Sequence, residues 1–198
     1  MAARVLRAAD RRAVPWKNGG GVTSEVAAGP PGSDLASFDW RVSIAHVEMA
    51  GPFSVFPGVE RRLAVLEGQL ELAVGGRPPL VLTPESAPLV FSGETPAAGR
   101  PQGARVTDLN VMTRIARCAA RLERGAGANA PARVAGHTAL LIALTGFEAA
   151  VDGAPQQLAR LDALLLAPGT SLSFAGREVT ADFWWIEIVP PGRNLSLP

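Results

Sequence analysis

Short runs of alternating apolar and polar residues recur along the 198-residue chain, separated by glycine and proline. In the run 70–74, Leu70, Leu72 and Val74 fall on one face of an extended strand, because successive side chains of a strand point to opposite faces. This run is the second of two strands predicted within 61–76. Similar runs predict strands at 38–47, two within 80–94, and at 104–113, 139–145, 147–151, 162–167, 171–174 and 183–189. Many short strands at near-even spacing predict an all-β sandwich or barrel.

The two halves of the chain share one rhythm. Segments 63–91 and 140–174 both contain an apolar strand, a glycine, a second strand, a turn and a proline-marked strand. This order predicts a duplicated β-unit. Between the two segments, residues 115–123 are compatible with a strand or a short helix, and a loop rich in Gly, Ala and Pro follows residue 124.

Composition narrows the class of protein. Hydrophobic residues make up 47% of the chain and charged residues 19%, which is enough apolar material for a packed core. The net charge is +1, and acidic and basic residues are interspersed along the chain. Neither nucleic acid nor a membrane surface is therefore an expected partner. The longest apolar run, 139–147, is short of the ~20 residues that span a bilayer. Without a secretory signal, and with Cys118 as its single cysteine, the chain is expected to be soluble and cytoplasmic.

The segment "DLNVMTR" at 108–114 carries several polar residues at alternate positions. As a strand it places Asp108, Asn110, Met112 and Arg114 on one face. In an antiparallel sheet such a face commonly meets solvent. If it faces a barrel interior instead, the carboxylate, amide and guanidinium must pair with one another or bind a ligand. The sequence leaves both interpretations open.

Two other predicted strands offer polar residues. Arg41 and Ser43 share one face of the strand 38–47, and His46 lies on the opposite, apolar face, where a hydrogen-bonded structural role is expected. Arg61 and Arg62 are adjacent, so only one of them can enter a cavity from a regular strand.

Metal and nucleophile motifs are missing from the sequence. His46 and His137 are far apart, and neither H-x-H nor H-E-x-x-H occurs. No metal site and no cofactor are therefore expected. The sequence also lacks G-x-S-x-G, and it identifies no catalytic residue.

The stretch "PWKNGGG" at residues 15–21 is the most unusual motif. It does not match a phosphate loop, because Lys17 precedes the glycines instead of following them. Asn18-Gly19 is a strong hairpin dipeptide, which favours a turn. The two further glycines exceed what a turn needs, and they would allow close backbone approach or expose N–H groups to an anion. Turn and site are both open.

Several segments together resemble the HutD/Ves family. They are "PWKNGGGVTSEVA", "FDWRVSIAHVEMAGPFSVFPGVERRLAVLEG", "FSGETP" and "VTDLNVMTR", in the family's order. The resemblance implies a cupin-superfamily bicupin over residues 1–198, with two jelly-roll barrel halves at 1–115 and 116–198 and the pocket in the first. It also implies a link to histidine utilisation as a small-molecule-binding regulator, whereas the Ves branch is associated with cold and stress. In "FSGE", Glu94 stands where the family is expected to prefer Asp.

The resemblance and the residue patterns give one set of expected ligand-binding residues: Trp16, Lys17, Asn18, Gly19, Arg41, Ser43, Arg61, Asp108 and Asn110. The first hypothesis is a metal-free bicupin that binds a small carboxylated metabolite of the formylglutamate, formate or urocanate class, held by the two arginines. The second is an isomerase or hydrolase with Asp108 or Lys17 as acid/base. The third is an interaction protein without a ligand, which forms a homodimer through sheet edges and exposed parts of Trp184 and Trp185.

Overall fold

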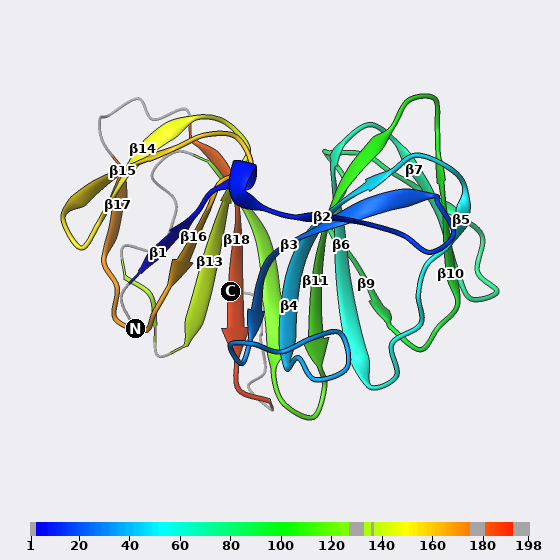
Figure 1. Cartoon of the computed structure of the whole chain (residues 1–198), viewed down its shortest axis with the longest axis horizontal. Coiled ribbons are helices and arrows are strands. Elements are labelled where there is room, and N and C mark those ends of the chain that lie inside the picture. The colour runs from blue at the N-terminus through cyan, green and yellow to red at the C-terminus, as the bar shows by residue number, and fades with distance from the viewer. Residues whose placement is uncertain (1–2, 127–132, 136, 175–180, 192–198) are drawn as a thin grey trace. The chain divides into compact units, whose positions relative to one another are not determined.

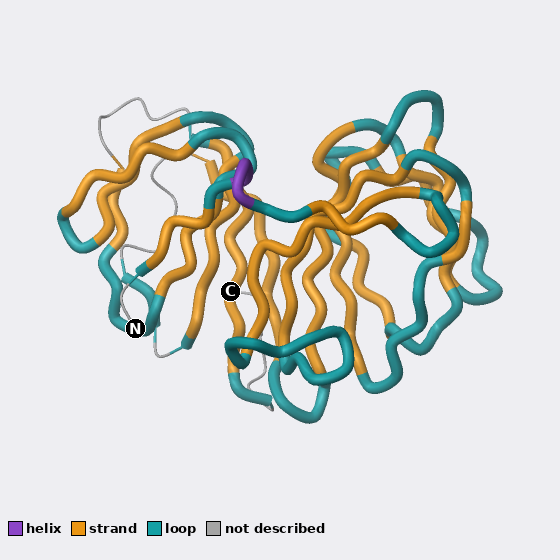
Figure 2. Tube along the Cα trace, in the orientation of Figure 1, coloured by secondary structure: helices purple, strands orange, loops and turns teal. Residues whose placement is uncertain are grey.

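The computed structural model describes residues 3–126, 133–135, 137–174 and 181–191, and almost all of their regular structure is β-strand (Figures 1 and 2). One short 3-10 helix, η1 (Ala8–Asp10), interrupts the strands near the N-terminus. The all-β class predicted from the sequence is confirmed. Within the described ranges, no helix has the length and apolar character needed to cross a membrane.

The chain divides into two compact units, Arg12–Cys118 and Met1–Arg11 with Ala119–Pro198. The first unit contains a six-stranded antiparallel sheet and a four-stranded antiparallel sheet. The six-stranded sheet has the order β2 (Ala13–Pro15), β3 (Gly21–Gly29), β4 (Trp40–Val47), β11 (Val106–Arg114), β6 (Val59–Glu67), β9 (Leu89–Ser92). The four-stranded sheet has the order β5 (Gly51–Pro52), β10 (Ala97–Pro101), β7 (Leu70–Val74), β8 (Leu80–Leu82).

One apolar cluster joins the two sheets of the first unit. Leu63 and Val65 of β6 pack with Leu70 and Leu72 of β7 and with Phe53, and all five are at most 9% exposed. The period-two pattern read from the sequence at Leu70 and Leu72 is therefore a core-facing pattern.

The second unit repeats this arrangement with fewer strands. Its five-stranded sheet has the order β1 (Arg4–Leu6), β16 (Ala163–Leu166), β13 (Thr138–Ala143), β18 (Asp182–Val189), β12 (Ala119–Ala126). Its three-stranded sheet has the order β15 (Ala154–Leu158), β14 (Phe147–Val151), β17 (Leu172–Phe174). The rings of Phe147, Phe174 and Phe183 contact one another in its core, with centroids 5.4–6.3 Å apart.

The two units share a strand order, which is what a duplicated β-unit would produce. The order β4-β11-β6-β9 of the first unit recurs as β12-β18-β13-β16 in the second, and β10-β7-β8 recurs as β17-β14-β15. Seven strands thus occupy matching positions in both units. This correspondence allows the two interiors to be compared position by position.

The structure also decides or corrects several expectations. The undecided segment 115–123 contributes a strand, β12, which begins at Ala119. Trp184 and Trp185 are only 3% and 4% exposed, so the tryptophan surface named for the interaction hypothesis is buried instead. No prediction covered β1, β2, β3, β5, β10 and β15.

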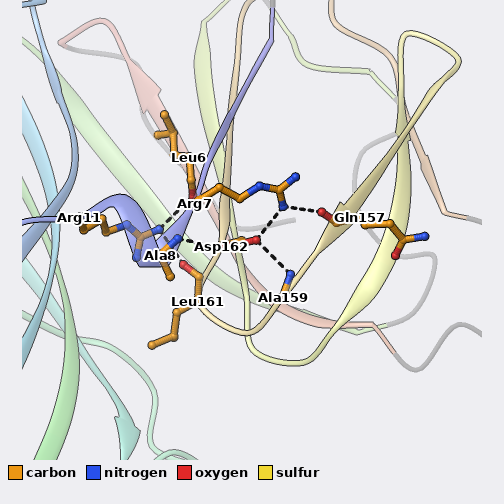
Figure 3. Close-up of polar contacts among 8 residues, drawn as sticks. All are labelled: Leu6, Arg7, Ala8, Arg11, Gln157, Ala159, Leu161 and Asp162. Carbon is orange, nitrogen blue, oxygen red and sulfur yellow. Dashed lines mark hydrogen bonds and ion pairs between the residues drawn. The ribbon is translucent and has the colours of Figure 1, made fainter.

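The first eleven residues belong with the C-terminal half, although residues 1–115 were expected to form one half. Strand β1 pairs with β16, and Asp162 anchors the segment that follows (Figure 3). The Asp162 carboxylate accepts hydrogen bonds from Arg7 Nη1 at 2.8 Å, Ala8 N at 2.7 Å and Ala159 N at 3.1 Å. Arg11 Nη2 donates to the Leu161 carbonyl at 2.6 Å. The pairing of β1 with β16 and the hydrogen bonds of the Asp162 carboxylate thus fix the N-terminal segment, although both partners are distant in sequence.

Asp162→Ala should destabilise the second unit. The change leaves two backbone N–H groups and Arg7 without their acceptor, and we expect a loss of roughly 2–4 kcal/mol in the free energy of unfolding near pH 7. Burial alone would raise the pKa of Asp162, but hydrogen bonds from Ala8, Arg7 and Ala159 outweigh it and lower that pKa. This stabilisation is therefore present above the unfolded value of about 3.9 and lost as the pH falls below it.

Denaturant unfolding of parent and variant between about pH 3 and pH 7 measures this effect. Asp10→Ala, a change at an exposed carboxylate of the same segment, serves as the matched control and should leave the stability near that of the parent. A difference between parent and Asp162→Ala that is independent of pH would contradict the role given to this carboxylate.

Candidate functional site

The inner face of β11 carries the polar residues that the sequence singled out. Antiparallel register aligns Asn110 with Ser43 of β4 and Leu63 of β6, and it aligns Met112 with Arg41 and Arg61 on the same two strands. Since residues that pair directly across strands lie on the same face, these side chains share the face that holds the Leu63 core. The interior interpretation of this polar face is the one that the structure supports.

A hydrogen-bonded chain links three of these residues. Arg61 Nη2 donates to Asn110 Oδ1 at 2.7 Å, and Asn110 Nδ2 donates to Asp108 Oδ1 at 2.5 Å. All three are buried, with exposed fractions of 6% for Arg61, 6% for Asn110 and 1% for Asp108. The amide therefore stands between the cation and the carboxylate, and uses its acceptor on one and its donor on the other.

Arg61 is held mainly by aromatic rings. Its guanidinium carbon lies 5.3 Å from the centroid of Phe53 and 5.0 Å from that of Phe91, which pairs with it across β6 and β9. Such contacts contribute about 0.5–2 kcal/mol each. Its Nη1 is 3.5 Å from the Ser54 carbonyl, and its buried Nε has no hydrogen-bond partner. Among the described residues Arg61 has no ion pair, which is a costly state for a buried charge.

Burial shifts the protonation of both charged groups. Desolvation raises the pKa of Asp108 to about 7, against the opposing effects of the Arg61 charge and the Asn110 hydrogen bond. Desolvation also lowers the pKa of Arg61 to about 10. The charge of Asp108 opposes this decrease in pKa, and the charge of the nearby Arg41 adds to the decrease. Asp108 Oδ2 is buried and has no hydrogen-bond partner. At neutral pH, Arg61 remains charged and Asp108 is close to its titration midpoint.

Arg41 and Ser43 lie at the margin of this cluster. Arg41 Nε donates to Glu25 Oε2 at 2.8 Å, and its Nη1 donates to Ser43 Oγ at 3.3 Å. Sequence reasoning missed Glu25 as a partner. The register of β3 against β4 shifts between Glu25 and Ala27, and this irregularity obscures the alternation that would have placed the carboxylate on the inner face.

Trp16 is the residue of "PWKNGGG" that contacts an aromatic side chain of the site. Its indole Nε1 donates to Thr23 Oγ1 at 2.7 Å, and its ring meets Phe53 edge to face with centroids 5.8 Å apart. Phe53 in turn lies under Arg61. Trp16 therefore supports the aromatic wall of the site instead of contacting the polar chain directly.

The rest of the motif is a turn. Gly19 N donates to the Trp16 carbonyl at 3.0 Å, and Gly20 N donates to Asn18 Oδ1 at 3.0 Å, so these N–H groups are already used. Gly19 has φ +71°, and a Cβ on Gly21 would lie 2.3 Å from the His46 carbonyl oxygen. Lys17, Asn18 and Gly19 are exposed, and no described contact joins them to Arg61, Asn110 or Asp108.

Neighbouring residues take structural roles. Arg62, on the opposite face from Arg61, pairs with Glu60 at 2.6 Å, as expected for the second of two adjacent arginines. His46 Nδ1 lies 3.0 Å from Thr107 Oγ1, which confirms a hydrogen-bonded histidine. Glu94 Oε1 accepts from Gly58 N at 2.8 Å and so fixes a loop. Among the described residues, no three His, Cys, Asp or Glu side chains gather as a metal ion would require.

The second unit lacks this polar cluster at the matching positions. When Gly68 is aligned with Gly146, Arg61 corresponds to Ala139. The pairing of β18 with β13 then places Phe183, Trp185 and Glu187 where Asp108, Asn110 and Met112 lie. Phe183 and Trp185 belong to the apolar core of that unit. The shared fold can therefore fill this space with aromatic rings, and it does not require the charged chain.

Asp108→Asn should change how stability depends on pH. Because the folded pKa of Asp108, about 7, exceeds the unfolded value of about 3.9, ionisation destabilises the fold as the pH rises between these values. We expect the variant to be more stable than the parent by roughly 1–3 kcal/mol near pH 8 and equal to it near pH 4.

Denaturant unfolding from about pH 4 to pH 8 tests this expectation. Glu48→Gln, which removes an exposed carboxylate, should reproduce the parent profile. Parallel profiles for the parent and Asp108→Asn would show that the carboxylate titrates alike in the folded and unfolded chains.

Trp16→Ala and Lys17→Ala separate the two parts of the glycine-rich motif. Loss of the indole removes its hydrogen bond and its contact with Phe53, and should cost about 2–3 kcal/mol of stability. The exposed Lys17 should change stability by less than about 0.5 kcal/mol. Thermal unfolding measures both, and equal effects would be inconsistent with this division.

Comparisons with known proteins identify the family of the chain. The family model HutD matches residues 8–181. An uncharacterized 21.2 kDa protein from the hutC 3′ region of Pseudomonas putida is 36% identical over 188 residues, which cover 94% of this chain and 97% of that protein. Protein Ves of Citrobacter koseri is 38% identical over 108 residues, which cover 54% of this chain and 56% of Ves.

Solved structures extend the similarity to the fold. HutD from Pseudomonas fluorescens SBW25 superposes with a TM-score of 0.82 at 31% identity, covering 96% of this chain and 100% of that chain. A cupin 2 conserved barrel domain protein from Leptotrichia buccalis gives a TM-score of 0.60 at 12% identity, with 89% and 92% covered, and so shares the fold alone. The resemblance read from the sequence motifs is thereby confirmed, and the chain belongs to the HutD family.

Proposed function

We propose that the protein binds a small carboxylated metabolite at Arg61 and acts as a regulator linked to histidine utilisation. The observation that carries this proposal is a buried guanidinium without an ion pair, whose Nε–H has no acceptor. A buried cation in this state gains most from an anion that supplies both charge and hydrogen-bond acceptors.

The surrounding groups fit a carboxylate. Arginine presents planar donors that match the two oxygens of a carboxylate, and Phe53 and Phe91 keep the guanidinium plane in place. Arg41 adds a second positive charge near the site, since its charge acts on Arg61. Ser43, at the hydrogen-bonding edge of Arg41, offers a hydroxyl for a further polar atom of the ligand.

The relatives suggest which carboxylates to test. One is named from the hutC 3′ region, and the HutD structure from Pseudomonas fluorescens carries the description "Formate condition". Formate, formylglutamate and urocanate are therefore the first candidates for this chain. A metal-free bicupin architecture, with the ligand in the first unit, is part of the same proposal.

A second candidate function is catalysis with Asp108 as general acid or base. It is favoured by one observation: desolvation raises the pKa of this carboxyl to about 7, close to the pH at which such a group works best. Lys17, the other group considered for this role, is exposed in a turn. Chemical turnover of a bound ligand would identify an enzyme.

Binding of the three candidates can be measured by thermal shift and by calorimetry. A ligand at about 100 times its Kd should stabilise the protein by roughly 2.7 kcal/mol. Arg61→Ala should abolish that stabilisation because it removes the only buried cation of the described site. Arg61→Lys should weaken it, since the ammonium lacks the bidentate geometry.

Arg62→Ala is the matched control, because Arg62 is adjacent in sequence, lies on the opposite face and pairs with Glu60. It should bind like the parent. The proposal fails if none of the carboxylates stabilises the parent, or if Arg61→Ala, shown to be folded by near-UV circular dichroism, binds them equally well.

A further inference from the structure

Asp108 is an unusual neighbour for an anion-binding arginine. Its side chain is 1% exposed, its Oδ1 accepts from Asn110, and its Oδ2 is buried without a hydrogen-bond partner. The closest hydrogen bond of Arg61 goes to Asn110 and not to this carboxylate. The site thus holds one unsatisfied acid oxygen and one unsatisfied guanidinium N–H, on two groups whose charges act on each other.

Few other charges face this carboxylate. The inward residues of β6 are Arg61, Leu63 and Val65. Those of β4 include Arg41, Ser43 and Ala45. The charge of Arg41 is paired with that of Glu25 on β3. The four-stranded sheet contributes apolar groups to the shared core, including Leu70, Leu72 and Ala97. His46 alternates onto the opposite face of β4, where it contacts Thr107.

A carboxylate ligand at Arg61 would therefore bring a second anion into a buried site that already holds Asp108. Two carboxylates sharing such a site repel each other strongly, and one of them takes up a proton. Oδ1 is occupied by the amide of Asn110, so Oδ2 is the oxygen free to carry the proton. Once protonated, Oδ2 changes from an unsatisfied acceptor into a hydrogen-bond donor.

We propose that this site binds its carboxylate together with one proton, taken from solvent by Asp108 on Oδ2. The inference rests on the proposed function and adds its regulation. The ligand oxygens then accept from the Arg61 guanidinium and from the Asp108 O–H, and no charge is left uncompensated. Affinity for a carboxylate is thereby coupled to pH.

The protonation equilibria agree with this direction. Desolvation raises the pKa of Asp108 to about 7, so its proton is gained at little cost near neutral pH and at increasing cost above it. Arg61, with a pKa lowered to about 10, stays charged over the same range. The Kd for a carboxylate should therefore rise up to about tenfold per pH unit above about pH 7.

Calorimetric titration of the full chain with sodium formate tests the proposal. Measurements near pH 8 in buffers of different ionisation enthalpy give the number of protons exchanged, and we expect an uptake of about one per formate bound. Formate is ionised throughout this range, so the proton cannot be attributed to the ligand. Formamide, a neutral analogue that offers both a donor and an acceptor, should bind without net proton uptake.

Asp108→Asn should bind formate with no proton uptake and with a Kd that is independent of pH between about pH 6 and pH 9. The control Glu48→Gln removes an exposed carboxylate in place of the buried one, and it should retain the proton uptake of the parent. Because the buffer series uses the parent protein, the test does not depend on whether Asp108→Asn folds.

The two proposals fail in different ways. Formate binding that requires Arg61 but takes up no proton in the parent overturns the proton coupling and leaves the proposed function intact. Proton uptake that persists unchanged in a folded Asp108→Asn variant also overturns it, since another group would then titrate. The absence of Arg61-dependent binding for every carboxylate overturns both.

Discussion

The alternation of side chains along β11 is the constraint on which the site depends. This strand lies between β4 and β6, and both of its faces are buried, so each residue from Val106 to Thr113 must be accommodated inside the protein. Two of the inward positions hold Asp108 and Asn110, and the neighbouring inward position on β6 holds Arg61. Antiparallel register thus places an acid, an amide and a guanidinium together where water is excluded.

The second unit shows that the fold can form without this polar arrangement. The same strand order there surrounds Ala139, Phe183 and Trp185, which pack as an apolar core. Replacing a buried polar network by well-packed apolar groups commonly preserves or raises stability. The demands of the fold alone therefore do not explain the presence of Arg61, Asn110 and Asp108 in the first unit.

The sequence predicted those parts of the structure that local patterns encode. Period-two alternation located β4, β6, β7 and β11, and adjacency in a strand correctly separated Arg61 from Arg62. It did not reveal β3, because a register shift between Glu25 and Ala27 breaks the alternation. It also could not place residues 4–11, whose partners β16 and Asp162 lie about 150 residues away.

The motif "PWKNGGG" shows why composition alone could not separate a turn from a site. Gly19 has a left-handed backbone conformation, and Gly21 lies too close to the His46 carbonyl to carry a side chain. Neither requirement can be seen before the strands are paired. The motif's one contribution to the site passes through Trp16, whose ring supports Phe53 under Arg61. Lys17, one of the expected ligand-binding residues, is exposed in the turn together with Asn18 and Gly19.

Stability and binding make opposite demands on Asp108. The ionised form of Asp108 has one unsatisfied oxygen and lowers stability as the pH approaches neutrality, because desolvation disfavours the charge. A neutral residue of the same shape would avoid that cost, but it would also respond identically to anions at every pH. Under the proposed coupling, an ionisable group in this position would make the occupancy of Arg61 depend on proton concentration as well as on ligand concentration. The desolvation of a buried acid is thus the physical basis on which the proposed site would distinguish a charged carboxylate from a neutral analogue.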